Sequence, residues 1–175
     1  MAEEQEILFG TGDLFIVTEE DDGSGTMVEV ETKIGLSNGE AALNIEYETV
    51  DVRGDKNNKL LKVFKTSENI TFNAGIITYD LKEIGNFLDS KFTEDEVEGT
   101  RKLELGGDFK VNVNKLKFVH YKEDGKTITM TMHKATNVAG LEWTFNNEEA
   151  TSFPFEFRLM HDSEKNNTVE IVEEI

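Results

Sequence analysis

Polar and apolar residues alternate with a period of two along much of this chain, a pattern typical of half-buried β-strands. The alternation is clearest in residues 127–132 and 152–159. In the second stretch every other residue is large and apolar: Phe153, Phe155, Phe157 and Leu159. Shorter runs of the same kind occur at Val28–Thr32 and Leu43–Tyr47. We therefore predict an antiparallel protein built mainly from strands.

Three local features refine these strands. The apolar parity of Val111–His120 slips at Asn114-Lys115, which predicts a bulge in a long strand. Asp-Gly within Lys122–Lys126 predicts a hairpin turn, because the glycine supplies the positive φ that tight turns need. Pro154 lacks an N–H donor, so its strand should lie at a sheet edge or be paired on one side only at that point.

One helix is predicted among the strands, at about residues 80–89. Asp80 is a good N-cap, and Glu83 follows three residues later as its capping-box partner. Thr93–Glu96 resembles the start of a second helical turn, which Gly99 would end. The expected fold is mainly β: a two-sheet antiparallel β-sandwich or barrel of about eight to ten strands with one flanking α-helix.

Length and composition favour one domain spanning residues 1–175, with an acidic N-terminal region and a long hairpin excursion at about 51–69. The chain has no cysteine, which excludes disulfides and thiol chemistry. It also lacks an apolar run long enough to span a membrane. Its acidic start is unlike a signal peptide, so we expect synthesis and folding in a cytoplasm.

The formal net charge of −18 is unevenly distributed. Residues 1–32 contain ten carboxylates and no Lys or Arg, which argues against DNA or membrane binding through clustered cations. The segment Arg53–Lys65 breaks the pattern with five basic residues: Arg53, Lys56, Lys59, Lys62 and Lys65. Two interpretations remain open: a docking element, or a solvated hairpin whose lysines protect a strand edge from aggregation.

Candidate catalytic chemistry is sparse. His120, His133 and His161 are isolated in the sequence and lack the spacing of a zinc site. The acidic run Glu19–Gly23 lacks the ligand spacing of an EF-hand loop, so a solvated hairpin tip is favoured over a calcium site. We therefore expect no enzyme activity and assign no catalytic, cofactor-binding or metal-binding residue.

The ends of the chain resemble a known family. Residues 7–16, Ile-Leu-Phe-Gly-Thr-Gly-Asp-Leu-Phe-Ile, resemble the first strand of major tail tube proteins from tailed bacteriophages that infect low-GC Gram-positive bacteria. Phe153–Leu159 followed by a polar turn and Val169–Ile171 is similar to their C-terminal strand pair. The order of the intervening elements also fits: early strands, a hairpin excursion, one helix, then long strands.

The resemblance implies a structural virion protein that assembles into hexameric rings, which stack into a hollow tube for DNA ejection. Its partners would be copies of itself and other tail proteins, such as the tape measure, the tail terminator and, in a contractile tail, the sheath. DNA would pass through the lumen without specific binding. The chain would be assembled in the host cytoplasm and located in the phage tail.

In this reading the five basic residues of Arg53–Lys65 are candidates for contacts between rings, against acidic surface that includes the N-terminal region. Two alternatives remain. One is another virion protein, involved in tail completion or head decoration. The other is a soluble ligand-binding β-sandwich, for which Trp143 and Phe145 would supply an aromatic platform.

Overall fold

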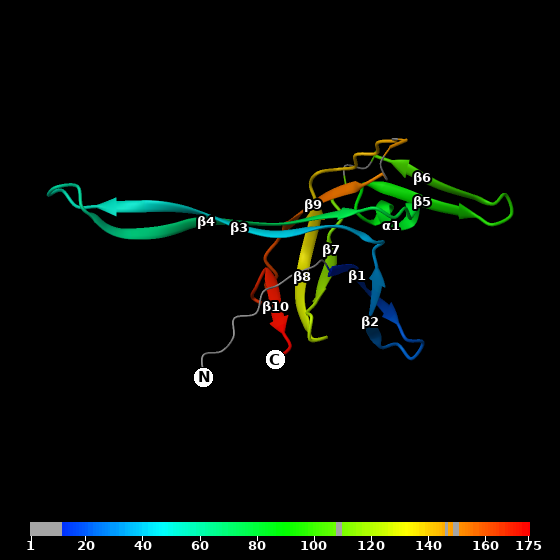
Figure 1. Ribbon diagram of the computed structural model, residues 1–175, viewed down its shortest axis with the longest axis horizontal. Coiled ribbons are helices and arrows are strands. Elements are labelled where there is room, and N and C mark those ends of the chain that lie inside the picture. Colours follow the sequence, from blue (N-terminus) through cyan, green and yellow to red (C-terminus); the bar gives the residue numbers. More distant parts are fainter. Residues whose placement is uncertain (1–11, 108–109, 146, 149–150) are drawn as a thin grey trace.

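The computed structural model describes residues 12–107, 110–145, 147–148 and 151–175. Within them the chain is mainly β, with antiparallel strand pairing throughout and one short helix, as the sequence predicts (Figure 1). The elements in chain order are β1 (Gly12–Asp21), β2 (Met27–Lys33), β3 (Ser37–Arg53), β4 (Leu60–Ile76), α1 (Leu81–Asn86), β5 (Ser90–Asp95), β6 (Thr100–Leu105), β7 (Asn114–Tyr121), β8 (Thr127–Asn137), β9 (Phe153–Leu159) and β10 (Val169–Glu173).

Strand β8 is the branch point of the main sheet. The hydrogen-bonded order is β2-β1-β7-β8-β9-β4-β3, with β10 also paired to β8, while β5 and β6 form a separate hairpin. Residues 128–132 of β8 pair with β10, and residues 135–137 pair with β9. The strands β3, β4 and β9 consequently run across the direction of β1, β7, β8 and β10 (Figure 1).

The core lies between these two groups of strands. The rings of Phe72 in β4 and Phe118 in β7 have centroids 5.5 Å apart, although three ladders separate their strands within the sheet. The sheet therefore bends until its two parts face each other, and buried side chains from β1, β4, β7, β8, β9 and α1 form one cluster. This arrangement removes a continuous apolar layer from water, which is the main favourable term in folding.

Strand β9 confirms the predicted alternation. Its apolar residues at odd positions are buried, and the residues between them are exposed. The ring of Phe87, just after α1, meets Phe155 and Phe157 edge to face at 5.2 and 5.1 Å. Pro154 is paired only with Gly75 of β4, because β8 reaches β9 only at residues 157–159. The prediction of one-sided pairing at this proline is therefore also confirmed.

The helix begins where predicted and ends earlier. The Asp80 carboxylate accepts hydrogen bonds from the backbone N–H groups of Lys82 (2.9 Å) and Glu83 (3.2 Å), so Asp80 is the N-cap. The α-helix stops at Asn86 because the next residue, Phe87, leaves helical geometry and turns its ring to β9. Helix α1 is six residues long, and no helix among the described residues has the length and apolar character needed to cross a membrane.

The predicted second helical turn at Thr93–Glu96 is wrong. Thr93 lies in β5 and pairs with Lys102 of β6. Asp95 accepts hydrogen bonds from the backbone N–H groups of Val97 (2.9 Å) and Glu98 (3.0 Å). The carboxylate thus closes a hairpin turn, and an N-cap-like residue can serve either purpose.

The register break before Leu116 is confirmed, because the β7–β8 ladder shifts between Asn114 and Leu116. Strand β7 begins only at Asn114, however, so the predicted strand over Val111–Val113 is absent. The amides of Asn112 and Asn114 explain the late start. Both donate to the carbonyl oxygen of Asn86 at the end of α1, which holds this segment on the helix rather than in the ladder.

The predicted hairpin turn after β7 is confirmed. The backbone N–H of Lys122 donates to the carbonyl of Lys126 at 2.8 Å. Gly125 has a φ of 85°, the left-handed conformation that glycine adopts without strain.

Replacing Phe157, whose side chain is fully buried against Phe87, should leave a cavity between α1 and β9. We expect Phe157→Ala to lower the free energy of unfolding by about 3–5 kcal/mol. The fully exposed Val97→Ala should change it by less than about 0.5 kcal/mol. Urea denaturation of both variants checks this, and similar stability of the two would contradict the assigned core.

Candidate interaction surface

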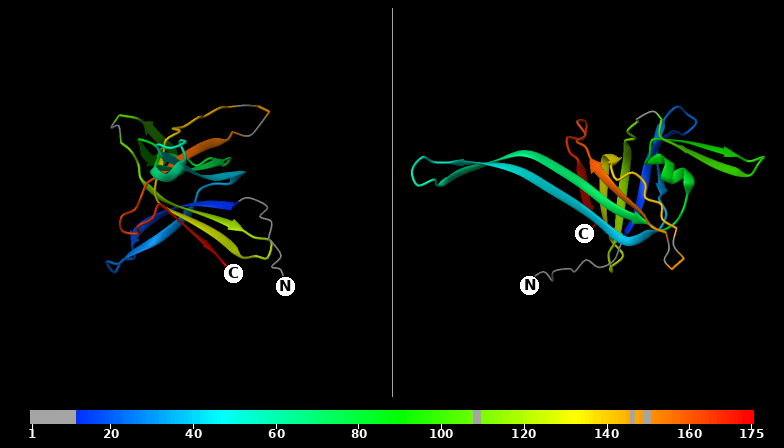
Figure 2. Two further views of the ribbon diagram at one scale, coloured as in Figure 1. Left: turned by 90° about the vertical axis from the view of Figure 1, so that its left-hand side faces the viewer. Right: turned by 90° about the horizontal axis from the view of Figure 1, so that it is seen from above.

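A long arm projects from the body of the molecule. Strands β3 and β4 each run for 17 residues, but β9 pairs only with Ile70–Ile76 of β4. Residues 46–69, here called the arm, therefore form a ribbon of two strands and a connecting turn (Figures 1 and 2). This stretch contains the hairpin excursion expected at about 51–69 and is longer than it.

Both faces of the arm carry exposed apolar side chains. Tyr47 and Val63 lie on one face and are 58% and 48% exposed. Val50 and its cross-strand partner Phe64 lie on the other face and are 53% and 47% exposed. A lone two-stranded hairpin is at best marginally stable in water, and contiguous exposed apolar side chains mark sites of interaction.

Two register shifts interrupt the arm, between Glu48 and Thr49 and between Val52 and Arg53. At the first, Thr66 is the extra residue on β4; at the second, Leu61 is. Each shift is a bulge that changes which β4 side chains share a face. The bulge at Thr66 places Val63 on the face of Tyr47 and Phe64 on the face of Val50.

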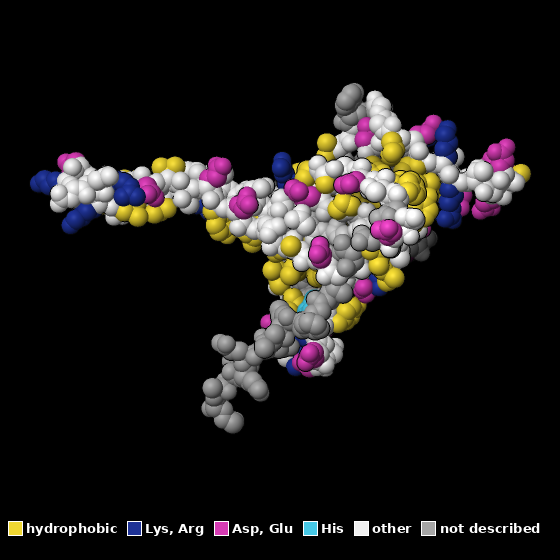
Figure 3. Space-filling view, turned by 45° about the horizontal axis from the view of Figure 1, so that its top comes forward, with side chains coloured by type: hydrophobic (Ala, Val, Ile, Leu, Met, Phe, Trp, Pro, Cys, Tyr) yellow, Lys and Arg dark blue, Asp and Glu magenta, His cyan; other side chains and the backbone are white. Residues whose placement is uncertain are grey.

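Four of the five basic candidates, Arg53, Lys56, Lys59 and Lys62, lie toward the outer end of the arm, where Figure 3 shows basic side chains, and Lys65 lies nearer its base, opposite Thr49. Arg53 pairs with Asp51 at 2.8 Å, and Lys65 pairs with Glu68. The ammonium of Lys62 lies 4.5 Å from the centroid of the Phe64 ring. Lys56 and Lys59 form no ion pair with any residue that the structure describes, so their charges are available to a partner.

The turn at the end of the arm has a defined conformation. The backbone N–H of Gly54 donates to the carbonyl of Lys59 at 2.9 Å. Asn57 and Asn58 have φ values of 63° and 51°, and asparagine is among the residues that adopt this left-handed region most readily. The closed turn holds Lys56 and Lys59 beyond the last strand pair.

A second exposed feature is an aromatic cluster on the body. Trp143 stacks on Phe145 with ring centroids 5.5 Å apart and contacts Tyr79 at 5.4 Å. Trp143 also meets the buried Phe153 edge to face at 5.6 Å, so it joins the surface to the core. These four residues, with Ile77 and Thr151, line a depression of about 390 Å³.

The remaining candidates for chemistry lie apart. His120 is in β7, His133 is in β8 and His161 is an exposed residue after β9. Among the described residues, no group of three or more His, Asp or Glu side chains is arranged to hold a metal ion.

In the acidic run Glu19–Gly23, two carboxylates close their own hairpin turn. Asp21 accepts from the N–H groups of Gly23 and Gly25, and Asp22 accepts from Ser24. Hydrogen bonds from the hydroxyl and backbone N–H of Ser24 lower the pKa of the Asp22 carboxyl. These contacts fit the predicted solvated hairpin tip.

Part of the predicted acidic N-terminal partner surface, residues 1–11, lies outside the described residues, as does the start of the family-like segment 7–16. Sequence reasoning found the basic residues of the arm from their charge. It could not show that the apolar side chains of the same segment are exposed, because alternation indicates a strand without indicating what covers it.

Comparison with known proteins assigns no relative: no protein-family model matches the chain, and no curated protein sequence matches it.

The arm should be separable from the folded body, because the first residue that β4 contributes to the buried core is Ile70. We expect replacement of residues 49–66 by Asn-Gly, which links the paired residues Glu48 and Ser67, to leave the free energy of unfolding within about 1 kcal/mol of the parent. Urea denaturation of dilute protein measures it. Loss of cooperative unfolding would show that the arm stabilises the body.

Proposed function

We propose that this chain is a major tail tube subunit of a tailed bacteriophage, which assembles into hexameric rings that stack into a hollow conduit for DNA ejection. The observation that carries the proposal is the arm, which extends exposed apolar side chains away from a separately packed core, together with two lysines that have no ion-pair partner among the residues described. The mainly β fold and the family-like terminal segments support it. In this proposal the protein is a structural part of the virion, assembled in the host cytoplasm.

Self-assembly would bury the exposed apolar side chains of the arm against a neighbouring copy of the chain. Fully burying an apolar side chain contributes about 1.5–3 kcal/mol, so burying the exposed half of one contributes on the order of 1 kcal/mol. Tyr47, Val50, Val63 and Phe64 are each about half exposed. A neighbouring subunit over the arm would therefore stabilise both the contact and the ribbon itself.

The charge of the chain suits a conduit for DNA. A hexameric ring would carry six times the formal charge of −18, and an acidic wall offers phosphates no binding sites. The lysines on the outer face of β1, β2 and β7 are paired: Lys33 with Asp13 and Lys117 with Glu31, both at 2.8 Å, and Lys115 with Glu29. The hydrogen bond from Lys115 lowers the pKa of the Glu29 carboxyl.

One observation favours a second candidate function, a soluble ligand-binding β-sandwich. The depression beside Tyr79, Trp143 and Phe145 presents aromatic rings to solvent. This candidate predicts a monomer that binds its ligand at these rings. Another virion protein, for tail completion or head decoration, would associate without forming long tubes.

Negative-stain microscopy and light scattering of the concentrated protein distinguish these functions. The proposal predicts rings of six 19.8-kDa chains and stacked tubes. A protein that remains monomeric over a wide range of concentration and salt would contradict it. Closed rings that never stack would favour the other virion roles.

Charge reversal at the end of the arm tests its role in stacking. We expect Lys59→Glu with Lys62→Glu to prevent stacking while the monomer stays folded, because repulsion replaces attraction to acidic surface. Lys91→Glu with Lys102→Glu, on the β5–β6 hairpin, makes the same change in net charge and should leave tubes intact. Tubes of normal length from the first variant would refute a docking role for these lysines.

A further inference from the structure

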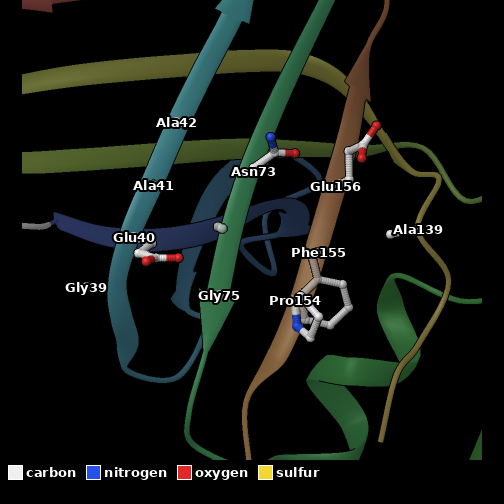
Figure 4. A pocket seen from close by; sticks show the side chains of 11 residues that line it. Gly39, Glu40, Ala41, Ala42, Asn73, Gly75, Ala139, Pro154, Phe155 and Glu156 are labelled. Atoms are coloured by element: carbon white, nitrogen blue, oxygen red, sulfur yellow. The ribbon is translucent and has the colours of Figure 1, made fainter.

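A shallow groove crosses the outer face of β3, β4 and β9 (Figure 4). It has a volume of about 650 Å³. Small residues form its floor: Ala42 from β3, Gly75 from β4 and Pro154 from β9. Ala139 closes one side, held there by the hydrogen bond from the Val138 N–H to the Glu156 carbonyl. Small side chains let another backbone approach the sheet closely.

The face that contains the groove is acidic. Glu40 and Glu156 line the groove itself, and Figure 4 shows them on its two outer strands. Glu46 and Glu48 continue the same face toward the arm, as the β3–β4 register requires. Arg158 is the basic side chain on this face of β9. Acidic side chains are visible along the base of the arm and the adjoining body in Figure 3.

The groove and the tip of the arm lie too far apart to meet within one molecule. Ala42 and Arg53 are eleven residues apart on one continuous strand, which corresponds to about 35 Å. The basic tip thus points away from the acidic face of its own chain (Figures 1 and 2). Only another copy can bring the two surfaces together.

We propose that this groove receives the arm tip of a second copy of the chain, with Lys56 and Lys59 facing Glu46 and Glu156. The inference rests on the proposed self-assembly and specifies its contact surface. Opposite charge on two surfaces of one chain favours this occupant, and Leu61, 66% exposed at the tip, supplies apolar area for the small-residue floor. The contact joins different patches on the two copies, so it propagates into a ring or a filament rather than closing a dimer.

Disulfide trapping tests the contact, since the natural chain has no cysteine. Ala42→Cys with Lys59→Cys places one thiol in the groove and one at the tip. We expect mild oxidation to give covalent chains longer than dimers, at least tenfold faster than Lys59→Cys with Val97→Cys. Val97 is the matched control because it is 97% exposed on the β5–β6 turn. Each single-cysteine variant should stop at the dimer.

The outcomes separate this inference from the proposed function. Tubes in the microscope with equal trapping rates for both pairs would overturn the groove contact and leave the tube proposal standing. Faster trapping of Lys59→Cys with Glu4→Cys would assign the tip to the N-terminal region and also overturn it. Absence of both assembly and trapping would overturn both proposals.

A charge exchange gives a second measurement. Glu46→Lys with Glu156→Lys should raise the protein concentration required for assembly at least tenfold. Adding Lys56→Glu and Lys59→Glu to that variant should bring the required concentration most of the way back to that of the parent. Failure of the four-residue exchange to restore assembly, with the monomer folded by circular dichroism, would overturn the assigned pairing.

Discussion

A ribbon of two strands cannot bury its own side chains, and this constraint governs how the molecule can be used. The body buries its own apolar side chains, because the sheet bends over a cluster of aromatic and aliphatic residues from β1, β4, β7, β8, β9 and α1. In the arm, at residues 46–69, β3 and β4 continue as a pair, and no third strand or opposing layer from the described part of the chain covers them. Apolar side chains such as Val50 and Phe64 then remain in water until another surface covers them.

The arm and the core are nevertheless one continuous structure. Strand β4 passes from the end of the arm, through pairing with β9, into contact with Phe118 across the core. The β9 rings are themselves held by Phe87 after the helix. The direction in which the arm leaves the body is therefore set by the well-packed residues at its base.

Local sequence signals predicted local structure well. The alternation of Phe153–Leu159, the cap at Asp80 and the Asp-Gly turn at Gly125 are all formed by neighbours in the chain. The turn at Asp95 was misread because an aspartate caps helices and hairpin turns alike, and pairing with β6 decided between them. The branching of the sheet at β8 could not be predicted, since it depends on pairing partners that are 20 or more residues away in the sequence. Charge identified Lys56 and Lys59, whereas the groove residues Ala42 and Gly75 carry no chemical signature.

Exposed apolar side chains lie on both faces of the arm, because Val63 and Phe64 are neighbours on β4 and Tyr47 and Val50 are three residues apart on β3. In the proposed assembly, each face would offer a separate contact surface to a neighbouring subunit. In the proposed assembly, binding of the first neighbour would include the entropic cost of ordering the ribbon, so the second would bind a ribbon that is already rigid. An array of such ribbons would therefore grow cooperatively, and loss of one subunit would weaken the contacts that hold two of its neighbours.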